Sequence, residues 1–186
     1  MAEHTSEAVE VTPYFDVEMF MGVAQETRIG GQMMDRLVDC WEKWSKELTV
    51  RRVKAGKIEY LVVWLGEPVE VEVDGLWEKS PSEAHLYNSL AQSIVMAAVH
   101  EILPEVQDAG CAPGPKPTEA LKDALEAEGI PYNLSETALS RRYAVVTHYP
   151  FKGGCEICYL LPNCPKGNGD NSSSTIVLPG FESGMS

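Results

Sequence analysis

The chain has 186 residues, enough for one domain with a sizeable hydrophobic core. Its 28 acidic residues outnumber its 15 basic residues, and a net charge of −13 repels the phosphate backbone of nucleic acids. No apolar run approaches the ~20 residues that span a bilayer, and the first residues lack the basic and apolar regions of a secretory signal. The sequence therefore predicts a soluble, cytoplasmic protein that binds neither nucleic acid nor membrane. A basic protein partner is compatible with the charge, and the oligomeric state stays open.

The N-terminal quarter contains a polar tail and one amphipathic helix. Residues 1–13 are polar and predict a disordered tail. Between Gln25 and Leu48, apolar residues recur at intervals of three and four, which places them on one face of a helix. Cys40 lies beside Trp41 near this apolar stripe, where a cysteine usually serves as a small core residue. The stripe consists of Ile29, Met33, Leu37, Trp41, Trp44 and Leu48.

The next segment has the composition of a β-hairpin. Residues 58–65 are rich in β-branched and aromatic side chains, and Gly66 and Pro68 follow them. In residues 69–74 valines alternate with acidic residues, which is the period of a half-buried strand. The pattern predicts an antiparallel pair with one acidic, solvated face. We interpret the row of acids as that solvated face rather than as a metal or catalytic site.

The second half of the chain mixes helices, a strand and irregular segments. Ser80 can cap a long apolar helix that Pro104 ends. A proline- and glycine-rich connection holding Cys111 follows, and it is expected to be irregular. The remaining expected elements are a short helix over 117–129, a helical turn over 135–139 and a strand over 143–148.

These elements predict a single α+β domain over residues 14–165. Its sheet is expected to be small, antiparallel or mixed, with about four strands packed against several helices. An irregular cysteine-rich loop, residues 153–165, is expected to close the domain. Residues 166–186 are expected to form a flexible tail.

This loop contains three of the five cysteines, and they fall within a stretch of ten residues. Cys155 and Cys158 form a C-x2-C pair, and Cys164 follows after five residues. A C-x2-C turn brings two sulfurs within reach of one metal centre, and a third can approach after one loop. Since four thiolates complete a tetrahedral zinc site or a cubane cluster, the motif requires a fourth ligand. An odd number of cysteines also argues against a fully paired disulfide framework.

Three residues are candidates for the fourth ligand. Cys111 is preferred because it lies in a loop, where packing alone does not require a cysteine. Cys40, on the helical stripe, is the second candidate. His148, near the end of the strand that leads into the motif, is the third, and it would favour zinc because three cysteines and one histidine are a common zinc set.

The C-x2-C-x5-C spacing with a remote cysteine is similar to the cluster-binding tail of certain iron–sulfur nucleases of the RecB type. The resemblance covers ten residues and implies a cluster as cofactor. The Asp…Glu-x-Lys metal site of that family has no clear counterpart in the hairpin region, so nuclease activity is not inferred.

The sequence favours an iron–sulfur cluster held by Cys155, Cys158, Cys164 and Cys111, with an electron-transfer or redox-sensing role. The alternatives are a structural zinc that stabilises a binding module, a redox dithiol formed by Cys155 and Cys158, and free thiols without a metal. A single C-x2-C pair argues against zinc, whose structural sites usually contain two. No catalytic or phosphate-binding motif is present, so whether the protein is an enzyme stays open.

Overall fold

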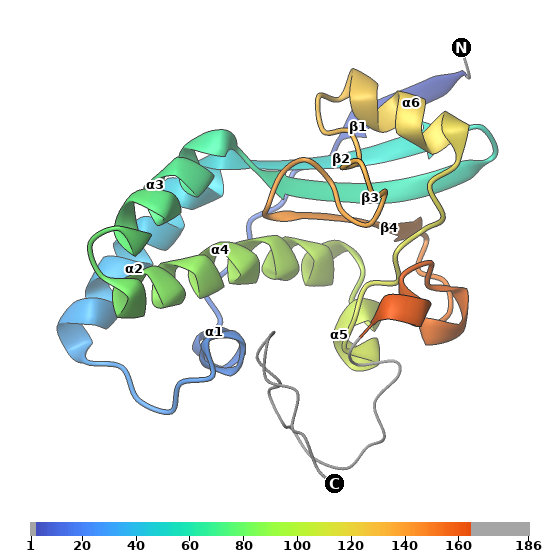
Figure 1. Cartoon of the computed structure of the whole chain (residues 1–186). Helices are drawn as coiled ribbons and strands as arrows, with labels where there is room; N and C mark the ends of the chain where they lie inside the picture. The colour runs from blue at the N-terminus through green and yellow to red at the C-terminus, as the bar shows by residue number, and fades with distance from the viewer. Residues whose placement is uncertain (1–2, 165–186) are drawn as a thin grey trace, which may run out of the picture.

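The sheet at the centre of the molecule has four antiparallel strands in the order β1-β2-β3-β4 (Figure 1). A computed structural model describes residues 3–164, and these contain one α+β domain with six α-helices. The expected fold class is confirmed. The strands are β1 (His4–Ala8), β2 (Leu48–Ala55), β3 (Ile58–Leu65) and β4 (Ala144–Tyr149). The helices are α1 (Val17–Ala24), α2 (Gly31–Trp44), α3 (Glu67–Trp77), α4 (Pro81–Ile102), α5 (Glu105–Ala109) and α6 (Glu119–Ala127). Three short 3-10 turns are described as well: η1 (Ser45–Glu47), η2 (Cys155–Ile157) and η3 (Leu161–Asn163).

β2 and β3 form the central hairpin. Ala55 pairs with Ile58, so the connection has two residues, and Gly56 adopts a positive φ of 63° that suits such a tight turn. β1 pairs along the other edge of β2, with His4 opposite Ala55. The expectation of disorder over residues 1–13 is therefore wrong for this strand, because pairing with β2 supplies main-chain hydrogen bonds that a polar sequence does not reveal.

The hydrophobic core is divided by the sheet into two parts. One face packs against α4, which is buried along most of its length, with α1, α2 and α3 around it. The other face packs against α6, through Leu121 and Leu125. Figure 1 shows α6 on one side of the sheet and α4 on the opposite side. The chain therefore crosses from one face to the other between α5 and α6. Contacts of residues 112–115 with β4 show that it does so beside this strand, near the C-terminal loop.

The predicted second hairpin strand over residues 69–74 is wrong, because this segment belongs to helix α3. Gly66 precedes the helix and Pro68 lies in its first turn, where proline is tolerated. Val69 and Val73, four residues apart, are fully buried, whereas Val71 is 63% exposed. Residues three or four apart lie on the same face of a helix. Alternating valines are therefore compatible with a helix in which Val69 and Val73 face the core and Val71 faces solvent.

The acidic residues of α3 form ion pairs and hydrogen bonds with neighbouring segments. Glu72 pairs with Lys43, and Asp74 holds Arg142 through two hydrogen bonds of 2.7 and 3.2 Å. Glu70 accepts the main-chain N–H of Arg142 at 2.9 Å. These contacts attach α3 to α2 and to the segment that enters β4.

Other expectations are confirmed in outline. The long helix begins after Ser80, whose hydroxyl accepts the Glu83 N–H, and the short helix begins after Thr118. The helical turn expected over 135–139 is wrong: a bridge between Tyr132 and Leu139 closes a small loop instead. The tail expected over 166–186 lies outside the described residues.

Candidate metal centre

The cysteine loop leaves β4 and folds as two consecutive 3-10 turns, η2 and η3. Gly153 has a φ of 58°, and a Cβ there would lie 3.1 Å from the Ile157 side chain, so the position requires glycine. The Cys158 N–H donates to the Cys155 carbonyl at 3.1 Å, which closes η2. The Cys164 N–H donates to the Leu161 carbonyl at 3.2 Å, which closes η3. The three cysteines thus occupy the ends of two short turns.

The segment after α5 is fixed to the rest of the protein, although its composition predicts an irregular surface loop. Gly110 ends α5 in the left-handed conformation, and Cys111 follows directly. Pro113, Pro115 and Pro117 are all buried. The buried hydroxyl of Thr147 in β4 donates to the Pro113 carbonyl at 2.9 Å. Because this bond holds the segment against the sheet, Cys111 has a defined position beside the cysteine loop.

The four cysteines chosen from the sequence line one cavity of about 40 Å³. Cys155, Cys158 and Cys164 contribute from the loop, and Cys111 contributes from the segment after α5. Cys111 and Cys155 are exposed, while Cys158 and Cys164 are partly buried, so the cavity lies at the molecular surface. In Figure 1, α5 and the orange-red cysteine loop lie side by side. The other lining residues are Ala109, Pro113, Gly154 and Leu161.

Gly114 connects the two segments around this cavity. Its N–H donates to the Sγ of Cys158 at 3.3 Å, and its carbonyl accepts the Tyr159 N–H at 2.9 Å. A Cβ at this position would lie 3.3 Å from two side-chain carbon atoms of Leu160, so a larger residue would require the Leu160 side chain to shift. Sequence spacing did not identify Gly114 or Thr147 as supports of the site, because both act through contacts with distant segments.

The remaining candidates for the fourth ligand lie elsewhere. Cys40 packs against the main core, and burial raises the pKa of its thiol to about 12, with the Glu72 carboxylate adding to the effect. The ring of His148 lies 5.5 Å from that of Tyr60, and burial, with the Lys152 charge, lowers its pKa. Neither residue lines the cysteine cavity, so among the three candidates the structure brings only Cys111 to the loop.

Four thiols around a cavity with apolar walls are the donor set of a tetrahedral zinc or of an iron–sulfur cluster. Within residues 3–164, no group of three or more His, Cys, Asp or Glu side chains is positioned to hold a single metal ion. The sulfurs surround the cavity and do not converge on one point.

No protein-family model, curated protein or solved structure matches the chain. Among residues 3–164, no helix has the length and apolar character needed to cross a bilayer.

Proposed function

We propose that Cys111, Cys155, Cys158 and Cys164 hold an iron–sulfur cluster and that the protein transfers electrons or senses redox state. The observation that carries this proposal is the single cavity that all four side chains line. Cys111 is separated from the C-x2-C pair by more than 40 residues, so their meeting depends on the fold and not on local sequence. A reducing compartment such as the cytoplasm keeps such thiols available to a metal.

The surroundings of the cavity support a cluster. The walls contributed by Ala109, Pro113 and Leu161 are apolar, and Cys158 and Cys164 are partly buried behind the exposed Cys111 and Cys155. The Gly114 N–H donates to the Cys158 sulfur, and hydrogen bonds to sulfur are among the factors that set the reduction potential of a cluster. The protein groups that would tune the centre are therefore present beside it.

The position of the site supports exchange of electrons with a protein partner. Cys155 is exposed, and the neighbouring large apolar side chains Ile157 and Tyr159 are 40% and 41% exposed. Exposed apolar side chains beside a redox centre can contact a partner while the acidic remainder of the surface attracts a basic one.

A structural zinc is the second candidate, and one observation favours it. The cysteines join the C-terminal loop to the segment between α5 and α6, and a tetrahedral ion would fix this junction. In that case the protein would be a binding module whose metal only stabilises the fold. A redox dithiol of Cys155 and Cys158 would need neither Cys111 nor Cys164.

Anaerobic purification followed by visible absorption and by analysis for iron, sulfide and zinc tests the proposal. A brown protein with stoichiometric iron and sulfide is expected, with loss of both in Cys158→Ala and retention in Cys40→Ala. A colourless protein with one zinc per chain would instead identify the site as a structural zinc site. A chain that binds neither metal after anaerobic reconstitution would contradict both candidates.

A further inference from the structure

A second cavity, of about 210 Å³, lies along the outer edge of β4. Among residues 3–164, β4 is the last strand of the sheet, so one of its edges has no neighbouring strand in this part of the chain. Three consecutive residues, Ala144, Val145 and Val146, line the cavity. Successive side chains of a strand point to opposite faces, so a cavity that meets three in a row must lie at the strand's edge, against its main chain.

The main-chain groups that face this edge follow from the register. Tyr143 lies opposite Leu65, and its carbonyl accepts the Leu65 N–H at 3.0 Å. In an antiparallel pair, hydrogen-bonded and non-bonded positions alternate, so the N–H and C=O groups of Ala144 and Val146 point away from β3. Among residues 3–164, these outward groups form no hydrogen bond with the protein.

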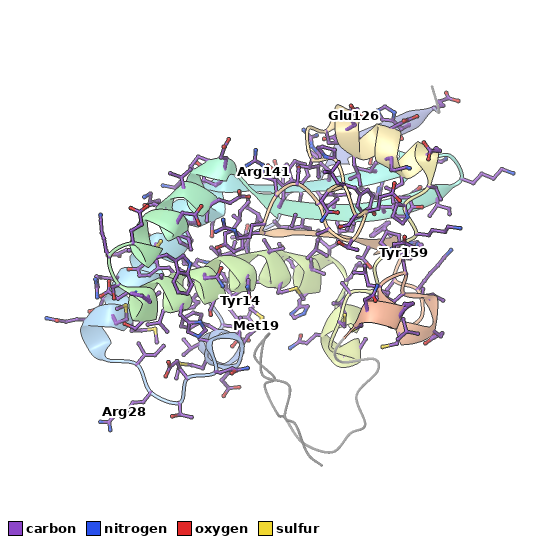
Figure 2. All side chains as sticks on the ribbon, in the orientation of Figure 1. Tyr14, Met19, Arg28, Glu126, Arg141 and Tyr159 are labelled. Carbon is purple, nitrogen blue, oxygen red and sulfur yellow. The ribbon has the colours of Figure 1, made fainter. Side chains whose placement is uncertain are left out.

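The cavity is short and bounded at both ends. Gly114, Tyr159 and Leu160 close the end beside the cysteine loop, and Arg141 lies at the end near α3. Figure 2 shows Arg141 toward α3 and Tyr159 beside the cysteine loop. Leu139, from the loop before β4, adds an apolar wall. The open edge between these boundaries is therefore three residues long, which suits a small ligand rather than a full partner strand.

We propose that this cavity binds a small molecule with a secondary amide between two short apolar groups. The amide C=O would accept the Val146 N–H and the amide N–H would donate to the Val146 C=O, as the next strand of a sheet would do. The apolar groups would contact Leu139 on one side and Leu160 on the other. An apolar cavity of about 150 Å³ holds benzene, so this one has room for roughly ten non-hydrogen atoms.

Such an amide can belong to a free small molecule or to the end of a peptide. The probes are N-isobutylisobutyramide and the tripeptide acetyl-Ala-Val-Ala with a free C-terminal carboxylate, added to the ¹⁵N-labelled full chain as purified. We expect saturable amide shifts centred on Ala144, Val146 and Tyr159, with a dissociation constant of about 1 mM or below for the better probe. Tighter binding of the tripeptide would identify a peptide end as the source, and tighter binding of the small amide a free metabolite.

Two comparisons make the test specific. The N-methyl tertiary amide of the first probe lacks the N–H and should bind at least about tenfold more weakly to the unaltered chain. Ala144→Phe should fill the cavity and abolish binding, whereas Leu134→Phe, in the same loop before β4 but with a fully exposed side chain, should not affect it. Absence of saturation by either probe, or equal binding of the tertiary amide, would overturn the proposal. The ligand cavity and the cysteine cavity share no lining residue, so failure of the titration would leave the cysteine centre unaffected.

Discussion

The main-chain N–H of Gly114 donates to the Sγ of Cys158, 44 residues later in the chain, at 3.3 Å. This hydrogen bond joins the two segments that supply the four cysteines, and the reverse bond from Tyr159 to the Gly114 carbonyl strengthens the junction. The proposed metal centre thus has a preformed support, and the support can be altered without removing a ligand.

Gly114→Ala is expected to destabilise the protein and to weaken metal retention. The new Cβ would lie 3.3 Å from Leu160, and overpacking of this kind costs about 1 kcal/mol or more. Gly75→Ala is the matched control, because a Cβ there meets nothing within 4 Å and alanine in a helix is favoured by about 0.5–1 kcal/mol. Denaturant unfolding and metal content of both variants measure the effects. If both variants had the same unfolding free energy and metal content, the close approach of Gly114 to Leu160 would not be needed for stability or for metal retention.

Cys111→Ser is expected to reduce metal affinity at least about tenfold, because it removes one of four proposed ligands. Cys40→Ser should retain the metal, since Cys40 lies in the main core away from the cavity. Competition with a chelator under anaerobic conditions, followed by metal analysis, measures both. Loss of metal in Cys40→Ser with retention in Cys111→Ser would reverse the assignment of the fourth ligand.

Thr147→Val tests the bond that positions the segment carrying Cys111. The substitution preserves shape but leaves the Pro113 carbonyl without its 2.9 Å donor, which should cost about 1–2 kcal/mol of unfolding free energy. Thr5→Val, at an exposed position of β1, should change stability little. If Thr147→Val were as stable as the unaltered chain, the hydrogen bond would not be what holds the segment.

Val69→Ala and Val71→Ala distinguish helix α3 from the strand that the sequence suggests. Val69 is fully buried, so its truncation should cost about 2 kcal/mol. Val71 is 63% exposed, so its truncation should be neutral or slightly stabilising in a helix. Thermal or denaturant unfolding gives both values. Similar losses at the two positions would indicate a strand with all valines on one buried face.

Acidification is expected to destabilise the protein partly through His148. Burial, with the Lys152 charge, lowers the pKa of this histidine below its ordinary value of 6.5 in the folded state. The unfolded chain then binds a proton more readily, so stability from the neutral ring is present above pH 6.5 and is lost as the pH falls toward the lowered pKa. His148→Gln should reduce the slope of unfolding free energy against pH in this window. His100, whose pKa burial also lowers, should account for part of the remaining slope. An unchanged slope in His148→Gln would exclude His148 as a source of the pH dependence of stability.

The local sequence determined several elements because their signals are strong. Ser80 and Pro81 begin α4 as a capping residue and a first-turn proline, and the apolar body of the helix requires burial on several sides. The apolar stripe from Met33 to Trp44 specifies α2, and the β-branched run before Tyr149 specifies β4. The cysteine spacing marked residues 153–165 as the candidate site, because a C-x2-C pair brings two sulfurs within reach of one metal centre.

Only the tertiary structure decided the rest. The valines after Pro68 fit a strand equally well, and what selects α3 is the core that buries Val69 and Val73 on one side. Residues 4–8 become a strand because the β2 edge is available to them. Cys111 reaches the loop because the chain crosses between the two faces of the sheet from α4 to α6, and the Thr147 hydroxyl holds Pro113 beside β4 on the way. Local propensity is set by neighbouring residues, but these outcomes depend on contacts between segments far apart in the chain, and no short window of sequence contains that information.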